Sequence, residues 1–152
     1  MTKPDWPDLL HPPDPAAVQM LLERFWDDLV ELADLLPRQE LLLAAERVAR
    51  LRATVLAMML ALNGIERPPA TRHLNGYLGP SQRAALEKTL VAPTGAAEDW
   101  LGQAVALVVI YRWYAPQLVE RYQLRYPSDR EAAVWATLRD ALPAWPQAVT
   151  TG

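Results

Sequence analysis

The chain has 152 residues, of which 51% are hydrophobic and 22% charged, and its net charge is −3. A length and composition of this kind predict one globular domain with its own core, and they exclude a disordered or collagen-like chain. The absence of cysteine excludes disulfides and thiolate sites, and the acidic balance disfavours nucleic acid as a partner, because such binding needs clustered Lys and Arg.

The N-terminal segment carries no apolar stretch typical of a signal peptide. The longest apolar runs, residues 53–62 and 104–111, are shorter than the ~20 residues that span a bilayer. We therefore expect a cytoplasmic protein with no membrane partner.

Residues 1–14 contain four prolines and three aspartates without periodicity, which predicts an extended N-terminal arm. Asp14 followed by Pro15 is typical of a helix start, because Asp caps free amides and Pro needs no donor there. A stripe at three- and four-residue spacing then predicts a first helix that ends at Pro37. The stripe consists of Val18, Leu22, Phe25, Leu29, Ala33 and Leu36.

The second predicted helix covers residues 38–62 and ends at Asn63-Gly64, where Gly supplies the left-handed residue that commonly closes a helix. Glu46 and Arg50 lie four apart on its outer side and are expected to pair. Residues 64–79 contain paired prolines and three glycines, which forbid a regular helix. They form the one long loop of the predicted fold, and loops of this length are usually functional or mobile.

A third short helix is predicted over residues 80–90, and Thr94 is placed to cap a fourth. The fourth helix is apolar on every side over residues 104–111, which predicts a place at the centre of the bundle. We expect it to continue past Pro116 with a kink.

Ser128 and Glu131 match the S-x-x-E capping box and predict the start of a fifth helix, which runs to Leu142. No segment alternates with period two for long enough to form a strand. The predicted fold is therefore all-α: a five-helix up-and-down bundle built on a four-helix core, with a helical domain over residues 15–142 and a flexible tail over residues 143–152.

Four carboxylates recur at helical spacing along the first predicted helix: Glu23, Asp27, Glu31 and Asp34. Like charges four apart cost an isolated helix about 0.2–0.5 kcal/mol per pair, and a cationic ligand would offset this cost. The simpler alternative is a solvated face, with Arg24 partly neutralising Asp27 and Asp28.

Trp26 lies beside this stripe and is a candidate for a cleft wall, although most tryptophans in such stripes belong to the core.

Arg38 and Glu40 lie at the turn between the first two helices. Glu40 either interacts with the helix dipole or accepts a substrate proton or hydrogen bond. Arg52 lies between core positions and either snorkels or, if buried, needs a carboxylate partner.

Catalytic patterns are absent from the chain: there is no Gly-rich phosphate loop and no nucleophile-base arrangement. The two histidines, His11 and His73, are too few for a metal site. Arg67 and His73 superficially resemble the Arg/His pair of HEPN-type ribonucleases, but Pro68 and Pro69 prevent its helical presentation. We expect no catalytic residue, no cofactor and no metal.

Read in order, several segments resemble the C-terminal helical domain of aminoglycoside nucleotidyltransferase-like proteins, especially the 6-adenylyltransferase group. The resemblance covers nearly the whole chain. The matching segments are Glu23-Arg24-Phe25-Trp26, Arg38-Gln39-Glu40-Leu41-Leu42, Arg72-His73-Leu74 with Tyr77-Leu78, Leu86-Glu87-Lys88-Thr89 and Tyr126-Pro127.

In that family a separate N-terminal domain holds nucleotide and metal with a Gly-Ser turn and an Asp-x-Asp-like pair, and this chain has neither. The resemblance therefore implies the acceptor-binding half of such an enzyme, inactive alone, with a cationic small molecule as ligand and a separately encoded nucleotidyltransferase domain as partner. An interaction module that forms a homodimer is the alternative. The expected substrate-binding residues are Glu23, Trp26, Asp27, Glu31, Arg38, Glu40, Arg72 and His73.

Overall fold

The computed structural model describes residues 8–90 and 96–146. Over these ranges the chain is all-α, as predicted, and contains no strand. No helix in this part is long and apolar enough to cross a membrane. The elements are α1 (Pro15–Val30), α2 (Leu32–Leu35), α3 (Leu41–Leu62), the 3-10 helix η1 (Leu74–Tyr77), α4 (Pro80–Glu87), α5 (Ala97–Tyr122) and α6 (Ser128–Ala141).

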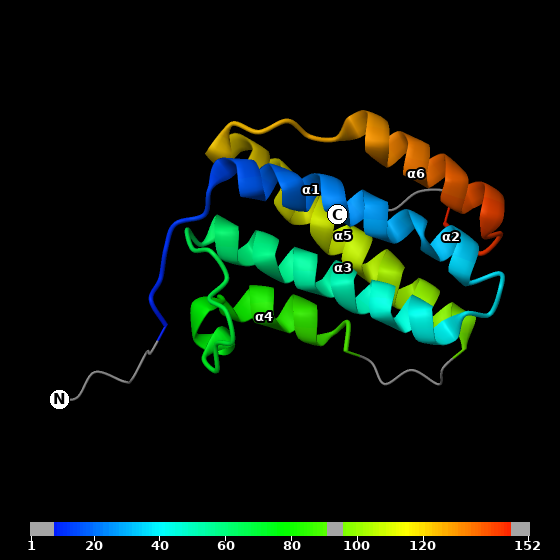
Figure 1. The fold of residues 1–152 in the computed structure, drawn as a ribbon, viewed down its shortest axis with the longest axis horizontal. Coiled ribbons are helices and arrows are strands. Elements are labelled where there is room, and N and C mark those ends of the chain that lie inside the picture. The colour runs from blue at the N-terminus through cyan, green and yellow to red at the C-terminus, as the bar shows by residue number, and fades with distance from the viewer. Residues whose placement is uncertain (1–7, 91–95, 147–152) are drawn as a thin grey trace.

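The helices pack around α1 and α3. Figure 1 shows α6, α1, α3 and α4 following one another across the view, with α5 behind α1 and α3. The most extensive contacts join α3 to α5 and to α1, and α6 packs on α1. The first and last helices of the described chain are therefore neighbours in space.

The first predicted helix is divided at Glu31 into α1 and α2. Glu31 keeps right-handed helical dihedral angles, so the break is small. Leu32, Leu35 and Leu36 are all buried after it. The predicted apolar stripe of the first helix ran through Ala33 and Leu36. After the break at Glu31, Leu32 and Leu35 are buried as well.

Three helix ends are followed by residues with positive φ. Gly64, at φ 88°, closes α3 as predicted, and the Ile65 amide donates to the Leu60 carbonyl at 3.0 Å. Gln39 and Gln123 take the same left-handed conformation after α2 and α5. Because Gln39 closes α2, α3 begins at Leu41 and not at residue 38 as expected.

Side chains from α5 bind the C-terminal end of α3. The Tyr122 hydroxyl donates to the Ala61 carbonyl at 2.6 Å, and the Arg121 guanidinium donates to the Leu62 carbonyl. The Ala61 carbonyl also accepts the Gly64 amide at 3.0 Å, so the two side chains add to the capping of the last carbonyl groups of α3. They tie the long loop that begins at Gly64 to the end of α5.

Helix α5 continues past Pro116 to Tyr122, as predicted, and begins at Ala97 after the N-cap Ala96. Thr94, the expected cap, lies outside the described residues. The apolar run over residues 104–111 is fully buried on one side, at Ala104, Leu107, Val108 and Tyr111, and half-buried on the other. Because α5 packs mainly on α3, it keeps an outer face, on which Trp113, beyond the run, is 56% exposed.

The predicted capping box at the start of α6 does not form. Ser128 is the first helical residue rather than the cap, and Pro127 precedes it without a side-chain cap bond. The Glu131 carboxylate instead accepts hydrogen bonds from the Tyr126 hydroxyl and, at 3.1 Å, from Arg112 Nη2. The Glu131 carboxylate therefore forms an ion pair between α6 and α5 and does not cap its own helix.

After α6 the chain turns back onto the bundle. Trp145 is 4% exposed and packs edge-on against Trp135, with ring centroids 5.3 Å apart. Residues 147–152 of the expected tail lie outside the described residues.

Candidate functional site

The four carboxylates on α1 and α2 lie along one edge of the bundle, and we call Glu23, Asp27, Glu31 and Asp34 the acidic edge. Helical spacing aligns them, and the apolar residues between them turn toward the core. The Asp27 and Asp34 side chains are 62% and 61% exposed, and that of Glu23 is 39% exposed. The acidic edge is therefore accessible to solvent over most of its length.

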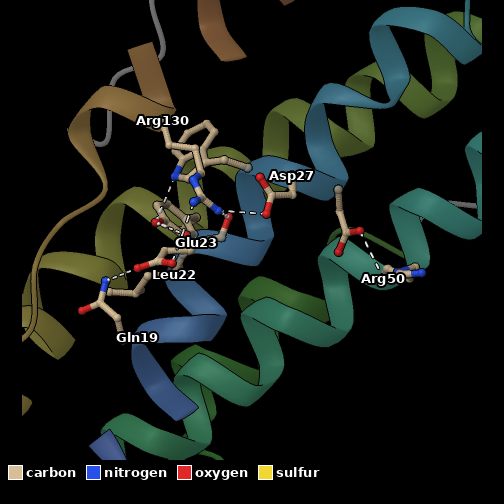
Figure 2. A network of polar contacts seen from close by, with 9 residues as sticks. Gln19, Leu22, Glu23, Asp27, Arg50 and Arg130 are labelled. Carbon is tan, nitrogen blue, oxygen red and sulfur yellow. Dashed lines mark hydrogen bonds and ion pairs between the residues drawn. The ribbon is translucent and has the colours of Figure 1, made fainter. Parts of the chain in front are cut away.

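Arg130 of α6 binds two of these carboxylates. Its Nη1 donates to Asp27 Oδ2 at 2.9 Å, and its Nη2 lies 3.9 Å from Glu23 Oε1 (Figure 2). Gln19 Nε2 donates to the other Glu23 oxygen at 2.9 Å. The neutralising charge thus comes from α6. The expectation that Arg24 neutralises Asp27 was wrong, because the packing of α6 on α1 brings Arg130 closer.

Arg38 connects the other end of the acidic edge to Glu40. Its Nη1 donates to Asp34 Oδ2 at 2.8 Å, and its Nη2 lies 3.9 Å from Glu40 Oε1. Glu40 precedes α3 as its N-cap residue but makes no side-chain cap bond. Glu31 is exposed and has no polar side-chain partner among the described residues.

Trp26 belongs to the core and does not line a cleft, so that expectation was wrong. It is 0% exposed, and its indole N–H donates to the Tyr111 hydroxyl at 3.0 Å. The Tyr111 hydroxyl donates in turn to the Leu22 carbonyl at 2.8 Å, and Phe25 stacks on its ring at 4.3 Å. Burial raises the pKa of Tyr111.

Arg72 and His73 lie in the long loop, which the N-terminal arm crosses. Asp8 Oδ2 accepts hydrogen bonds from Thr71 Oγ1 at 2.5 Å and from the Tyr77 hydroxyl at 2.6 Å, and these two bonds lower the pKa of the Asp8 carboxyl. Figure 1 shows this loop at the left of the view and the turn between α2 and α3 at the right. The eight expected site residues are therefore not brought together.

The loop also bears on the ribonuclease alternative. Arg67 and His73 both lie outside any α-helix, as the prolines between them predict. No part of this geometry reproduces a helical Arg/His pair.

Asp28 is a buried carboxylate that sequence reasoning assigned to a solvated face. It is 4% exposed, and its Oδ1 lies 3.3 Å from Arg47 Nη1 and 3.4 Å from Arg50 Nη2. Its Oδ2 is buried without a hydrogen-bond partner among the described residues. The sequence predicted that Arg50 pairs with Glu46, but Arg50 pairs with Asp28 instead. Figure 2 shows Arg50 on α3 directed toward α1.

A signal for Asp28 was present in the sequence. It follows Phe25 by three residues and precedes Leu29, so it falls within the apolar stripe of α1. Arg47 and Arg50 are three positions apart, a spacing that places both on one face of α3.

The described residues contain no group of three or more His, Asp or Glu side chains placed to hold a metal ion. Comparisons with protein-family models, with curated proteins and with solved structures find no match to this chain.

Proposed function

We propose that this chain is a helical module that binds polycations, and that it acts as the acceptor-binding half of a nucleotidyltransferase whose nucleotide-binding half is a separate chain. The observation that carries the proposal is the acidic edge, an exposed line of four carboxylates on α1 and α2. The family resemblance supplies the second half of the proposal and names aminoglycosides as the ligand class.

The arginines that neutralise the acidic edge are held weakly. Arg130 and Arg38 have side chains that are 41% and 60% exposed. Exposed ion pairs contribute about 0–1 kcal/mol each, because water screens both charges. Ammonium groups of a ligand therefore replace these arginines at low cost.

The length of the acidic edge suits a ligand with several amines. Glu23 and Asp34 are eleven positions apart, which corresponds to ~16 Å at 1.5 Å per helical residue. An aminoglycoside or a linear polyamine presents several ammonium groups over a comparable length. Such a ligand contacts several carboxylates at once, and this multiplies weak individual attractions.

Replacing Arg130 with Gln is expected to tighten polycation binding. Arg130 competes with the ligand for Glu23 and Asp27, so its removal should increase the affinity for kanamycin about threefold to fivefold at low salt. Calorimetric titration at low and at 0.5 M salt measures the effect, which high salt should suppress.

Arg139→Gln is the matched control, because Arg139 is exposed on the same helix and makes no ion pair among the described residues. Asp27→Asn should weaken binding. Equal affinities of the Arg130→Gln and Arg139→Gln variants would show that the acidic edge is not the site.

The outer face of α5 favours a second candidate, an interaction module that pairs with another copy. Trp113 is 56% exposed, and Val109 and Ile110 beside it on the helix are half-buried. Apolar surface of this kind on a helix commonly marks a protein contact.

Sedimentation velocity separates this candidate from the first. If α5 forms the contact, the protein should sediment as a dimer at tens of micromolar, and Trp113→Ser should return it to a monomer. Leu42→Ser is the control, since Leu42 is 87% exposed at the start of α3. A monomer at every concentration excludes this module.

A further inference from the structure

A cavity of about 310 Å³ lies between α3, the long loop and α4. Its walls are mainly apolar, and they come from Ala49, Ala53, Leu56, Leu74, Leu78 and Leu86. This volume is at the lower end of the range for small-molecule sites. Helix α4, which contributes to the cavity wall, lies on the opposite side of α3 from α1 (Figure 1).

Arg52 of α3 brings a half-buried positive charge to this cavity. Its Nε donates to Thr89 Oγ1 at 2.9 Å, and its Nη2 donates to the Thr89 carbonyl at 3.0 Å and to Gln103 Oε1 at 2.5 Å. All three acceptors are neutral, although a buried guanidinium was expected to require a carboxylate. Burial lowers the pKa of Arg52. Its Nη1 makes no hydrogen bond within the described ranges.

Arg67 of the long loop lines the same cavity. It is exposed and has no ion pair or side-chain hydrogen bond to any residue that the structure describes. The third arginine of the lining, Arg83, is neutralised by Glu87 at 2.9 Å. Two arginines that pair with no carboxylate of the described ranges therefore border an apolar cavity, in a chain whose net charge is −3.

We infer that this cavity binds a small amphipathic carboxylate, such as a short fatty acid. The apolar part contacts Leu56, Leu78 and Leu86, and the carboxylate accepts hydrogen bonds from Arg52 Nη1 and from Arg67. Guanidinium–carboxylate bonds are among the stronger hydrogen bonds in proteins, and partial burial strengthens them further. The inferred ligand has the opposite charge to the polycation of the proposed function and uses none of the same residues.

Calorimetric titration of the full chain with octanoate, octylammonium and octanol tests the charge requirement. Octanoate should bind with one-to-one stoichiometry, and octylammonium should bind at least tenfold more weakly, because two guanidinium groups repel it. Equal affinities for octanoate and octylammonium, or no saturable binding of octanoate at millimolar concentration, would overturn the inference.

Arg67→Gln tests the cationic contact without endangering the fold, because Arg67 is exposed and makes no ion pair or side-chain hydrogen bond with the residues described. It should weaken octanoate binding about tenfold and leave octanol binding unchanged. Arg72→Gln removes an exposed charge from the same loop outside the cavity lining and should change neither. If the two variants bind octanoate equally, Arg67 does not contact the ligand and the inference fails.

Ala53→Trp tests the cavity itself. Ala53 is an exposed helical residue of the cavity wall, so an indole there fills the open side without displacing core residues. Octanoate binding should be lost while the helical circular dichroism spectrum is kept. Unchanged octanoate affinity in this variant would place the ligand elsewhere. Kanamycin binding in the same variant should be unchanged, which separates failure of this inference from failure of the proposed function.

Discussion

Trp26→Ala is expected to lower the free energy of unfolding by roughly 3–5 kcal/mol, a large part of the roughly 5–15 kcal/mol that stabilises a typical domain. Trp26 is fully buried, and its ring packs edge-on against those of Phe25 and Tyr111 at 5.2 and 5.1 Å. Its removal leaves a cavity between α1 and α5 and deprives the Tyr111 hydroxyl of a donor. Urea denaturation followed by circular dichroism measures the loss.

Trp113→Ala is the matched control, because Trp113 lies on α5 but is 56% exposed. It should cost less than about 1 kcal/mol. Tyr111→Phe isolates the hydrogen bond: it leaves the buried Trp26 N–H without an acceptor and should cost about 1–3 kcal/mol. Similar losses for Trp26→Ala and Trp113→Ala would contradict the assignment of Trp26 to the core.

The double variant Arg47→Gln/Arg50→Gln is expected to lose about 3–5 kcal/mol of stability. The two arginines provide the only positive charges that the structure places against buried Asp28, whose side chain is 6% exposed. Without them the carboxylate is buried as an unpaired charge. Thermal and chemical denaturation measure this loss.

Adding Asp28→Leu to the double variant should restore most of the lost stability, because a buried leucine needs no partner and Asp28 Oδ2 has none within the part of the chain that the structure describes. Arg38→Gln/Arg83→Gln is the control, since it removes two arginines that bind exposed carboxylates. It should cost no more than about 1–2 kcal/mol in total. No rescue by Asp28→Leu would mean that the arginines stabilise α3 by another route.

The all-α character of the chain, the start of α1 and the end of α3 were predictable because backbone chemistry marks these helix ends locally. Asp14 accepts the Ala16 amide at 3.1 Å before Pro15, and Gly64 has the positive φ that its place after Asn63 predicts. Gln39 and Gln123 take the same conformation without glycine. No sequence signal marks the left-handed conformation at these two residues.

The environment of polar and aromatic side chains was less predictable, because it depends on which helices become neighbours. The pattern of α1 alone did not show that α6 would supply Arg130 to Asp27, or that α3 would supply partners for Asp28. The same limit explains Glu131, whose spacing from Ser128 favours a capping box but whose carboxylate binds across to α5. Residues of the acidic edge were found from spacing alone because exposure follows from helical periodicity.

The packing of α6 on α1 also determines how this bundle can assemble. Gln19 of α1 and Arg125, in the connection that leads from α5 into α6, are joined by two hydrogen bonds, of 2.8 and 2.9 Å, across a sequence separation of 106 residues. Helical bundles usually fold through contacts between successive helices, which close small loops quickly. Because α6 packs on α1 and α2, the side of α1 that faces α6 is covered only after α6 has been made. Closing so long a loop adds an entropic cost to the docking of α6 on α1.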